Sequence, residues 1–250
     1  MPLLLVKAGA SLVLIFLAVF CGTLPVRMKQ GVGTRRFFSL ANCFSAGVFV
    51  GAGLVHMLAD SAELLGPRWD FPVAFALCSA GFFLILAIDR LLGGHGEGAK
   101  NLSPLILGLI LSVHSVVAGT AVGLETHFAG AGILIVALVA HKGSEAFALG
   151  VQMAESDLGE RRVTRLMAIF SLMTPLGMAA GMFLSHAMVG DTALLLEGLF
   201  DAFAAGTFLY VGIMEILAEE FSHHGEGSLV PKFYLAVGGL VMMSVLAVWS

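Results

Sequence analysis

Four ionisable residues lie inside long apolar runs near the middle of the chain. His114 stands in one run, and His141, Lys142 and Glu145 stand together in the next. Ionisable groups at membrane depth are costly and therefore indicate function. On a helix, His141 and Glu145 share one face, one turn apart, where both can bind one ion. Two imidazoles and a carboxylate suit Zn²⁺ and related divalent transition metals better than Mg²⁺ or Ca²⁺, which prefer oxygen ligands.

Lys142 does not fit a simple cation site, because an ammonium beside such a site repels the ion. One interpretation is structural, an ion pair with Glu145 or with Asp89. The other is that Lys142 occupies, as a fixed charge, the place where a second metal ion would bind. The sequence leaves both open, and it also leaves open that the two histidines only join neighbouring helices through hydrogen bonds.

The composition excludes a water-soluble globule. Of 250 residues, 58% are hydrophobic and 12% charged, with a mean hydropathy of +0.97, whereas soluble domains are about 25% charged. The net charge of −4 and the absence of a basic run argue against a nucleic-acid partner. Cys21, Cys43 and Cys78 are widely spaced in apolar segments and predict neither a disulfide nor a metal finger. The lipid bilayer is the expected surrounding.

Continuous apolar runs of roughly 20 residues predict membrane-spanning helices, and alternating β-barrel strands are not expected. The connections are short, so residues 1–250 are expected to form one transmembrane domain, an all-α integral membrane protein. The first run ends at Cys21 to Pro25 without a cleavage signature and is interpreted as a retained span. The eight predicted spans are 3–24, 37–60, 72–92, 102–125, 129–153, 163–188, 193–219 and 231–249.

Basic residues in the connections predict the orientation of these spans. Ten of them fall on one side, and only Lys7 and Arg68 fall on the other. Because cytoplasmic loops are enriched in Lys and Arg, both termini are expected on the non-cytoplasmic side. His114 and His141 then lie about 18 Å into their helices from opposite faces, near the midplane. The ten are Arg27, Lys29, Arg35, Arg36, Arg90, Lys100, Arg161, Arg162, Arg165 and Lys232.

The second and seventh spans resemble each other. Residues 44–60 match 203–219 at an offset of 159, with seven of 17 positions identical. The two spans run in opposite directions, which predicts an inverted repeat of the kind found in secondary transporters. The fourth and fifth spans show a fainter match at an offset of 27, which pairs His114 with His141. Together these matches predict a 3+2+3 arrangement around a pseudo-two-fold axis.

The repeat places further polar residues along a pathway. His56 is expected toward the outer face and its counterpart Glu215 toward the inner face, with Asp201 outward. His56 is either an additional metal ligand or an interfacial histidine. Asp89 closes the third span beside Arg90, where a simple charge pair is the favoured interpretation. Two short His-rich tracts in cytoplasmic connections, 95–97 and 223–226, can collect metal only weakly.

Five short motifs occur along the chain. They are His114-Ser115-Val-Val-Ala118-Gly119, His141-Lys142-Gly-Ser-Glu145, Gly81-Phe-Phe-Leu, Thr174-Pro175-Leu-Gly177 and Ala205-Gly-Thr-Phe-Leu-Tyr210. Taken together they resemble the ZIP family of divalent-metal transporters over essentially the whole chain. The His-Lys start of the fifth-span motif is similar to the branch that contains the plasma-membrane zinc transporters of animals. Any one motif alone is weak, and the combination is specific.

The resemblance implies eight helices in a 3+2+3 inverted repeat and a metal site on the fourth and fifth spans. It implies His114, His141 and Glu145 as ligands, with His56 able to contribute. Ser115 occupies the motif position after the first histidine. Asp201 and Asp89 match acidic positions of the family, at the outer mouth and in the third span. The family's acid in the fourth span is Ala118 here, so a single metal site is expected.

The leading hypothesis is a transporter that moves Zn²⁺ into the cytoplasm through the midplane site by alternating access. Fe²⁺, Mn²⁺, Co²⁺ and Cd²⁺ are further candidate substrates, and no prosthetic group is expected. The expected location is the plasma membrane, or the inner membrane of a bacterium. A channel-like pore, a structural or sensing bundle and a homodimer remain open. An intramembrane zinc hydrolase is disfavoured because His141 to Glu145 lacks the His-Glu-x-x-His signature.

Overall fold

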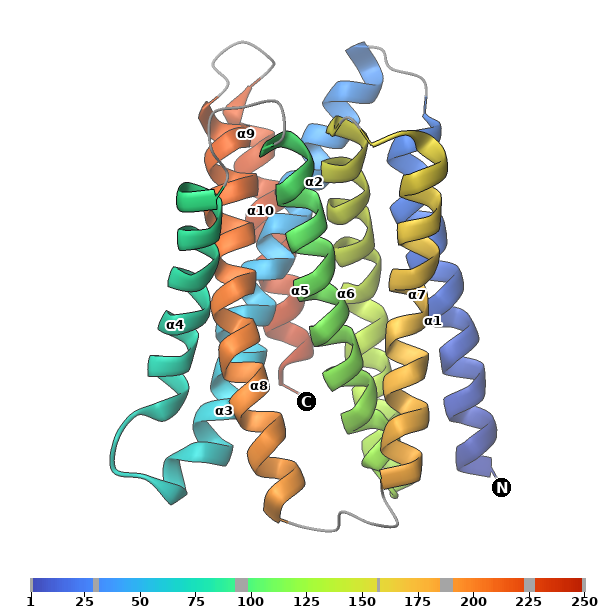
Figure 1. Cartoon of the computed structure of the whole chain (residues 1–250), viewed down its shortest axis with the longest axis vertical. Helices are drawn as coiled ribbons and strands as arrows, with labels where there is room; N and C mark the ends of the chain where they lie inside the picture. The colour runs from blue at the N-terminus through green and yellow to red at the C-terminus, as the bar shows by residue number, and fades with distance from the viewer. Residues whose placement is uncertain are drawn as a thin grey trace.

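The protein is a bundle of long helices that stand side by side along one axis (Figure 1). The computed structural model describes residues 2–28, 32–92, 99–156, 158–184, 191–222 and 228–248. Eight helices in these ranges are long and apolar enough to cross a membrane. The described residues contain no strand. The prediction of an all-α membrane protein with eight spans is therefore confirmed.

Five spans are single helices and three are composite. The composite spans change to π-helix, in which backbone hydrogen bonds skip one more residue than in an α-helix. The single helices are α1 (Pro2–Arg27), α5 (Ala99–Leu124), α6 (Phe128–Glu155), α7 (Glu160–Leu184) and α10 (Leu229–Leu246). The composite spans are α2 (Val32–Gly51), η1 (Ala52–Met57) and α3 (Leu58–Leu65), continued by the 3₁₀ turn η2 (Gly66–Arg68); α4 (Val73–Ala87) and η3 (Ile88–Leu92); and α8 (Asp191–Leu209), η4 (Tyr210–Leu217) and α9 (Ala218–Ser222).

The spans pack as two groups of four. In the α5–α6 group, α1 packs against α6 and α7, and α5 packs against α7. In the α2–α8 group, α2 packs against α10, and α4 packs against α8. Contacts of α2 with α6 and of α5 with α8 join the two groups. Both histidines and the glutamate of the central motifs thus belong to one group, and the pathway residues on the second and seventh spans belong to the other.

Several contacts support the predicted inverted repeat, which stays a prediction. Figure 1 shows α2 and α8 running in opposite directions along the bundle. The π-helical segments η1 and η4 overlap at the offset of 159. A side chain at Gly47 would collide with the carbonyl of Ala236, and one at its counterpart Gly206 with the carbonyl of Cys78. Helices that approach this closely need glycine at the contact.

The two ends of the bundle differ in charge. One end is here called the basic end. It contains the last residues of α1, η3, α6 and α9 and the first residues of α2, α5, α7 and α10. This end carries Arg27, Arg35, Arg90 and Lys232. At the opposite end, the buried Lys7 donates hydrogen bonds of 2.8 Å to the carbonyls of Gly123 and Glu125. A lysine in this place satisfies carbonyls that the last turn of α5 leaves unpaired.

Candidate metal centre

Three predicted ligands meet in the middle of the bundle. His114 of α5 and His141 and Glu145 of α6 each offer one ligand atom, and these atoms lie within 4.8 Å of one another. Oε1 of Glu145 is 3.4 Å from Nε2 of His141 and 3.7 Å from Nε2 of His114. All three residues are buried, with exposed fractions of 5%, 4% and 1% in chain order. His141 and Glu145 lie close together because they are four residues apart on α6, whereas the position of His114 depends on how α5 packs against α6.

The separations suit a small tetrahedral ion. Donor atoms about 2.0–2.1 Å from a tetrahedral Zn²⁺ lie about 3.3 Å from one another. The distances of 3.4 and 3.7 Å to Oε1 of Glu145 are close to that value. An N₂O donor set of two imidazoles and one carboxylate leaves a fourth position for another ligand. The geometry therefore fits Zn²⁺ without rearrangement of the helices.

The hydrogen bonding of the three side chains also indicates a ligand. Both ring nitrogens of His114, Nε2 of His141 and Oε1 of Glu145 are buried and have no hydrogen-bond partner among the described residues, while the ring of His141 also interacts with the backbone of Ala137, one turn earlier. Buried polar atoms are nearly always paired, and each unpaired one costs about 1–3 kcal/mol. One atom from each of the three residues, Nε2 of His114, Nε2 of His141 and Oε1 of Glu145, is explained by a cation that binds between them.

Lys142 pairs with the glutamate of this cluster. Its ammonium lies 3.3 Å from Oε2 of Glu145 and donates a 2.5 Å hydrogen bond to Oγ of Ser115. The ring of Phe170 lies on the other side, with its centroid 4.0 Å from Nζ. Asp89 is instead bonded to Tyr210 and Arg90. Of the two partners proposed for Lys142 from the sequence, the structure shows Glu145.

Aromatic side chains from the α2–α8 group cover the cluster on the α5 side. Phe208 of α8 meets the ring of His114 at a centroid distance of 4.7 Å. Phe49 of α2 meets Phe208 edge to face at 5.0 Å. Phe49 and Phe208 are counterparts at the offset of 159. The two buried rings therefore lie where the two groups of helices meet, directly beside a ligand.

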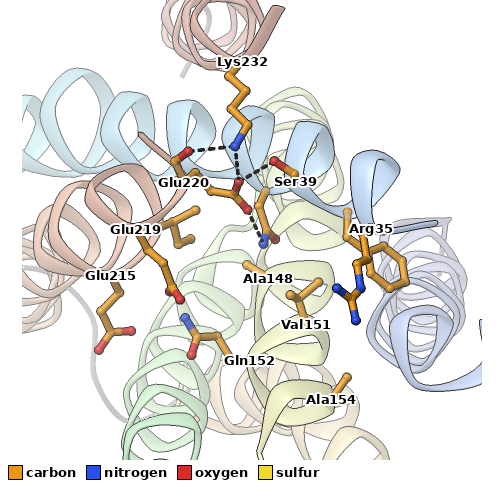
Figure 2. Close-up of a pocket in the computed structure, with 13 residues that line it drawn as sticks. Arg35, Ser39, Ala148, Val151, Gln152, Ala154, Glu215, Glu219, Glu220 and Lys232 are labelled. Atoms are coloured by element: carbon orange, nitrogen blue, oxygen red, sulfur yellow. Dashed lines mark hydrogen bonds and ion pairs between the residues drawn. The ribbon is translucent and has the colours of Figure 1, made fainter. Parts of the chain in front are cut away.

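A polar cavity lies at the basic end of the bundle (Figure 2). Its volume is about 590 Å³, and it lies between α2, α6, η4, α9 and α10. Ala148, one turn beyond Glu145 on α6, lines this cavity, and so does Gln152 one turn further. A second cavity of about 400 Å³ shares Gln152, Glu215 and Glu219 and also contacts Asp89. The metal cluster is thus approached by water-accessible space from the basic end.

One glutamate in the wall of this cavity joins three helices. Glu220 of α9 accepts hydrogen bonds from Ser39 and from Nδ2 of Asn42, both on α2, the latter at 3.3 Å. Nζ of Lys232, in the first turn of α10, lies 2.9 Å from Oε2 of Glu220 and 2.7 Å from its carbonyl oxygen. Figure 2 shows these side chains converging above Ala148. The contacts hold the basic ends of α2, α9 and α10 together.

Toward the opposite end, His56 belongs to a second polar group and also interacts electrostatically with His114 and His141. Nδ1 of His56 in η1 lies 2.8 Å from Oδ2 of Asp60, one turn later. Asp201 and Glu197 of α8 interact electrostatically with His56. Oδ1 of Asp201 is buried and has no hydrogen-bond partner among the described residues. The structure therefore places His56 with three carboxylates and does not bring it into the group of His114, His141 and Glu145.

Asp89 lies at the basic end, where the sequence favoured a charge pair. Its Oδ2 is 3.3 Å from Nε of Arg90 and accepts a 2.7 Å hydrogen bond from the hydroxyl of Tyr210. The charge pair is confirmed, and the link to the seventh span was not anticipated. Asp89 and Glu215 both line the second cavity. The His-rich tracts at 95–97 and 223–226 lie outside the described residues.

Sequence reasoning missed several polar residues of the pathway. Asp60 and Gln152 could have been found from helix spacing, because they follow His56 by four and Glu145 by seven residues. Glu197 and the partnership of Glu220 with α2 and α10 depend on contacts between helices, for which the sequence has no signal. Ala118 packs against the apolar cluster of Leu14, Val122, Leu138 and Met178 and adds no ligand.

This fold and this site define a class, a membrane-spanning transporter with a divalent-metal centre. The family model described as ZIP zinc transporter matches residues 4–104 and 98–247. Zinc transporter ZIP2 of Mus musculus is 31% identical, with 99% of each chain covered. Zinc transporter ZIP1 of Takifugu rubripes is 28% identical, with 97% of this chain and 98% of that protein covered. Zinc transporter 3 of Arabidopsis thaliana is 26% identical, with 86% and 75% covered.

The chain belongs to the ZIP zinc transporter family. The match covers most of the chain and includes every span. The family prediction from the motifs is therefore confirmed, and so is the prediction of a transporter that is not an enzyme. The divalent metal ion is the substrate of such a protein, and the bilayer is its surroundings.

Proposed function

We propose that this chain carries Zn²⁺ across the membrane into the cytoplasm through one midplane site made by His114, His141 and Glu145. The observation that carries the proposal is the convergence of three buried ligand atoms, one from each residue, with Oε1 of Glu145 at 3.7 and 3.4 Å from the two imidazole nitrogens. The site has one carboxylate, and the position of the family's acid in α5 is the apolar Ala118. A single ion per chain follows.

The two ends of the bundle support a pathway through this site. The group of His56, Asp60, Glu197 and Asp201 at the opposite end attracts cations, because three of its four members are carboxylates. The polar cavity at the basic end begins one turn from Glu145. Ions arriving at the carboxylates bind at the midplane and leave along Gln152, Glu215 and Glu219.

The basic end faces the cytoplasm in this proposal. Ten of the chain's 13 Lys and Arg belong to connections or helix ends on that side, and the positive-inside rule assigns such a side to the cytoplasm. Both termini then lie outside the cytoplasm, in the plasma membrane or a bacterial inner membrane. The cavity at the basic end makes the described state an inward-facing one.

Alternating access is the transport mode that the packing favours. All three ligands lie on the α5–α6 group, whereas His56, Asp201, Glu215 and Glu220 lie on the α2–α8 group. A displacement of one group against the other exposes the site to one side at a time, as in other carriers with repeats. A channel-like pore would need no such displacement.

Uptake of radiolabelled zinc into proteoliposomes tests the proposal. We expect saturable uptake that is lost in Glu145→Ala and strongly weakened in His114→Ala and His141→Ala. The matched control is His127→Ala, a histidine with 87% of its side chain exposed in the α5–α6 connection, which should transport as the unmodified protein does. Unchanged uptake in the three site variants would refute the site assignment.

Counterflow separates the carrier from the pore. Proteoliposomes loaded with unlabelled zinc should accumulate external label transiently above equilibrium if the site alternates between the two faces. A pore open to both sides shows no such overshoot. The same vesicles, supplied with Fe²⁺, Mn²⁺, Co²⁺ or Cd²⁺ as competitors, measure the preference among divalent ions, and light scattering of the detergent-solubilised protein distinguishes a monomer from a homodimer.

A further inference from the structure

Lys142 occupies a cradle formed by three helices of the α5–α6 group. Its side chain is completely buried. The ammonium donates to Oγ of Ser115 on α5, faces Oε2 of Glu145 on α6, and lies over the ring of Phe170 on α7. Hydroxyl, carboxylate and aromatic ring are all groups that stabilise an ammonium away from water. The cradle holds Nζ in one place.

The position of Lys142 divides the two oxygens of Glu145 between different partners. Oε1 faces the imidazoles of His114 and His141 at 3.7 and 3.4 Å. Oε2 faces Lys142 at 3.3 Å. A carboxylate can bind a metal ion through one oxygen or through both. With Oε2 held by the ammonium, only Oε1 is directed at the metal position.

We infer that Lys142 is a specificity-determining residue, which makes Glu145 a one-oxygen ligand and so favours Zn²⁺ over Mn²⁺. The inference rests on the proposed zinc transport through this site. Ser115 acts as a positioning residue, because its hydroxyl holds the ammonium against Oε2. Neither residue touches the transported ion.

Coordination chemistry supplies the reason. Zn²⁺ is satisfied by four ligands, and two imidazoles with one carboxylate oxygen provide three of them. Mn²⁺ favours oxygen ligands and six-coordinate geometry. Two imidazole nitrogens and one oxygen therefore serve Mn²⁺ poorly, and the second oxygen of Glu145 is the nearest donor that could improve its shell. Lys142 withholds that oxygen.

A purely electrostatic role for Lys142 predicts a different outcome. Removing a positive charge beside the site strengthens the binding of any divalent cation, so Zn²⁺ and Mn²⁺ gain alike. Releasing Oε2 benefits Mn²⁺ more than Zn²⁺. The quantity that separates the two roles is therefore the ratio of kcat/KM for the two ions, not the uptake of either one.

The test compares uptake of Zn²⁺ and Mn²⁺ by proteoliposomes containing three variants. In Lys142→Met, which removes both the charge and the contact with Oε2, we expect the Zn²⁺/Mn²⁺ ratio to fall about tenfold, a size typical for groups that orient metal ligands. Ser115→Ala keeps both charges and removes only the anchor, so a smaller fall in the same direction is expected. Ser115→Thr retains the hydroxyl and should preserve the ratio.

Thermal stabilisation by each metal in detergent provides a reading that does not depend on flux. We expect Mn²⁺ to raise the Tm of Lys142→Met and Ser115→Ala more, relative to Zn²⁺, than it raises that of the unmodified protein. If Lys142→Met does not fold, Ser115→Ala alone decides. The inference is overturned if the folded variants keep the Zn²⁺/Mn²⁺ ratio of kcat/KM of the unmodified protein and also show the same Tm shift with Mn²⁺ relative to Zn²⁺. Absence of zinc uptake by the unmodified protein, with metal-dependent Tm shifts present, overturns the proposed transport instead.

Discussion

The two central helices, α5 and α6, contribute unequally to the metal centre although their motifs correspond. At the offset of 27, His114 corresponds to His141, Ser115 to Lys142 and Ala118 to Glu145. The imidazoles are alike in burial and in their separation from Oε1 of Glu145. The carboxylate and the ammonium are both on α6, and α5 offers a hydroxyl and a methyl group in their places.

This difference is the reason why we expect the proposed site to hold a single ion. Two equal halves would bring two carboxylates to the centre and favour two cations. Here Glu145 is the only carboxylate of the cluster within the described residues, and it is shared with Lys142. The two nitrogen ligands therefore correspond between α5 and α6, whereas the charged groups of the cluster come from α6 alone. The following changes test that asymmetry.

The largest effect is expected for Glu145→Gln, which removes the one carboxylate of the α6 half. Zinc loses its charged ligand, and the buried ammonium of Lys142 is left without a counter-ion, which costs about 3–5 kcal/mol of stability. We expect zinc uptake to disappear and the Tm to fall. Both are measured on the purified protein, and retention of uptake would contradict the role of Glu145.

His114→Ala and His141→Ala should weaken zinc binding to a similar degree, because the imidazoles are the symmetric part of the centre. Each variant loses one of three protein ligands, and we expect KM for zinc to rise at least about tenfold. The comparison of the two KM values in proteoliposomes checks the equivalence. A large loss from one histidine and none from the other would show that only one of them binds the ion.

Ala118→Asp gives α5 the carboxylate that it lacks. Because the partly buried Ala118 packs against Leu14, Val122, Leu138 and Met178, a carboxyl there is partly withdrawn from water among apolar side chains, and we expect a stability loss of at most about 1–3 kcal/mol. Lys142 remains in the centre, so the metal content should stay at one zinc per chain. Elemental analysis of the loaded protein measures it, and two ions per chain would show that Ala118 alone enforces the single site.

Lys7→Met tests the connection between α5 and α6, at the opposite end of the bundle. Lys7 donates to the carbonyls of Gly123 and Glu125 at the end of α5. Without it these carbonyls lose their partners, which we expect to lower stability by about 1–3 kcal/mol. Lys7→Arg, which keeps the donors, is the matched control. The expected result is a fall in Tm for Lys7→Met alone, with zinc KM unchanged in both.

The smallest effect is expected at Glu125, where the connection to α6 begins. The backbone N–H of His127, helped by its side chain, donates to Glu125 and holds the pKa of this carboxyl below its usual value. A lowered pKa stabilises the fold at neutral pH, and this contribution is lost as the pH falls through the lowered pKa, below the usual range of a carboxyl. Glu125→Gln should remove this part of the pH dependence of Tm, worth less than about 1 kcal/mol at an exposed site.

Much of the site could be predicted from the sequence because its strongest relations are local. The separation of His141 and Glu145 by four residues places them on one helix face in any α-helix. The pairing of Lys142 remained open, since it depends on the rotamer and on Ser115 from another helix. His56 was assigned to the ligands by its motif position, and in the structure it pairs with Asp60.

The sequence by itself determined the eight spans and the family, because apolar length and ligand spacing are properties of single segments. Only the tertiary structure decided which segments meet. The glycine contacts set the register between helices, and that register brings His114 to Glu145, directs Oε2 toward Lys142 and joins Glu220 to Lys232. Contacts between helices depend on packing around the whole bundle, which no single segment encodes.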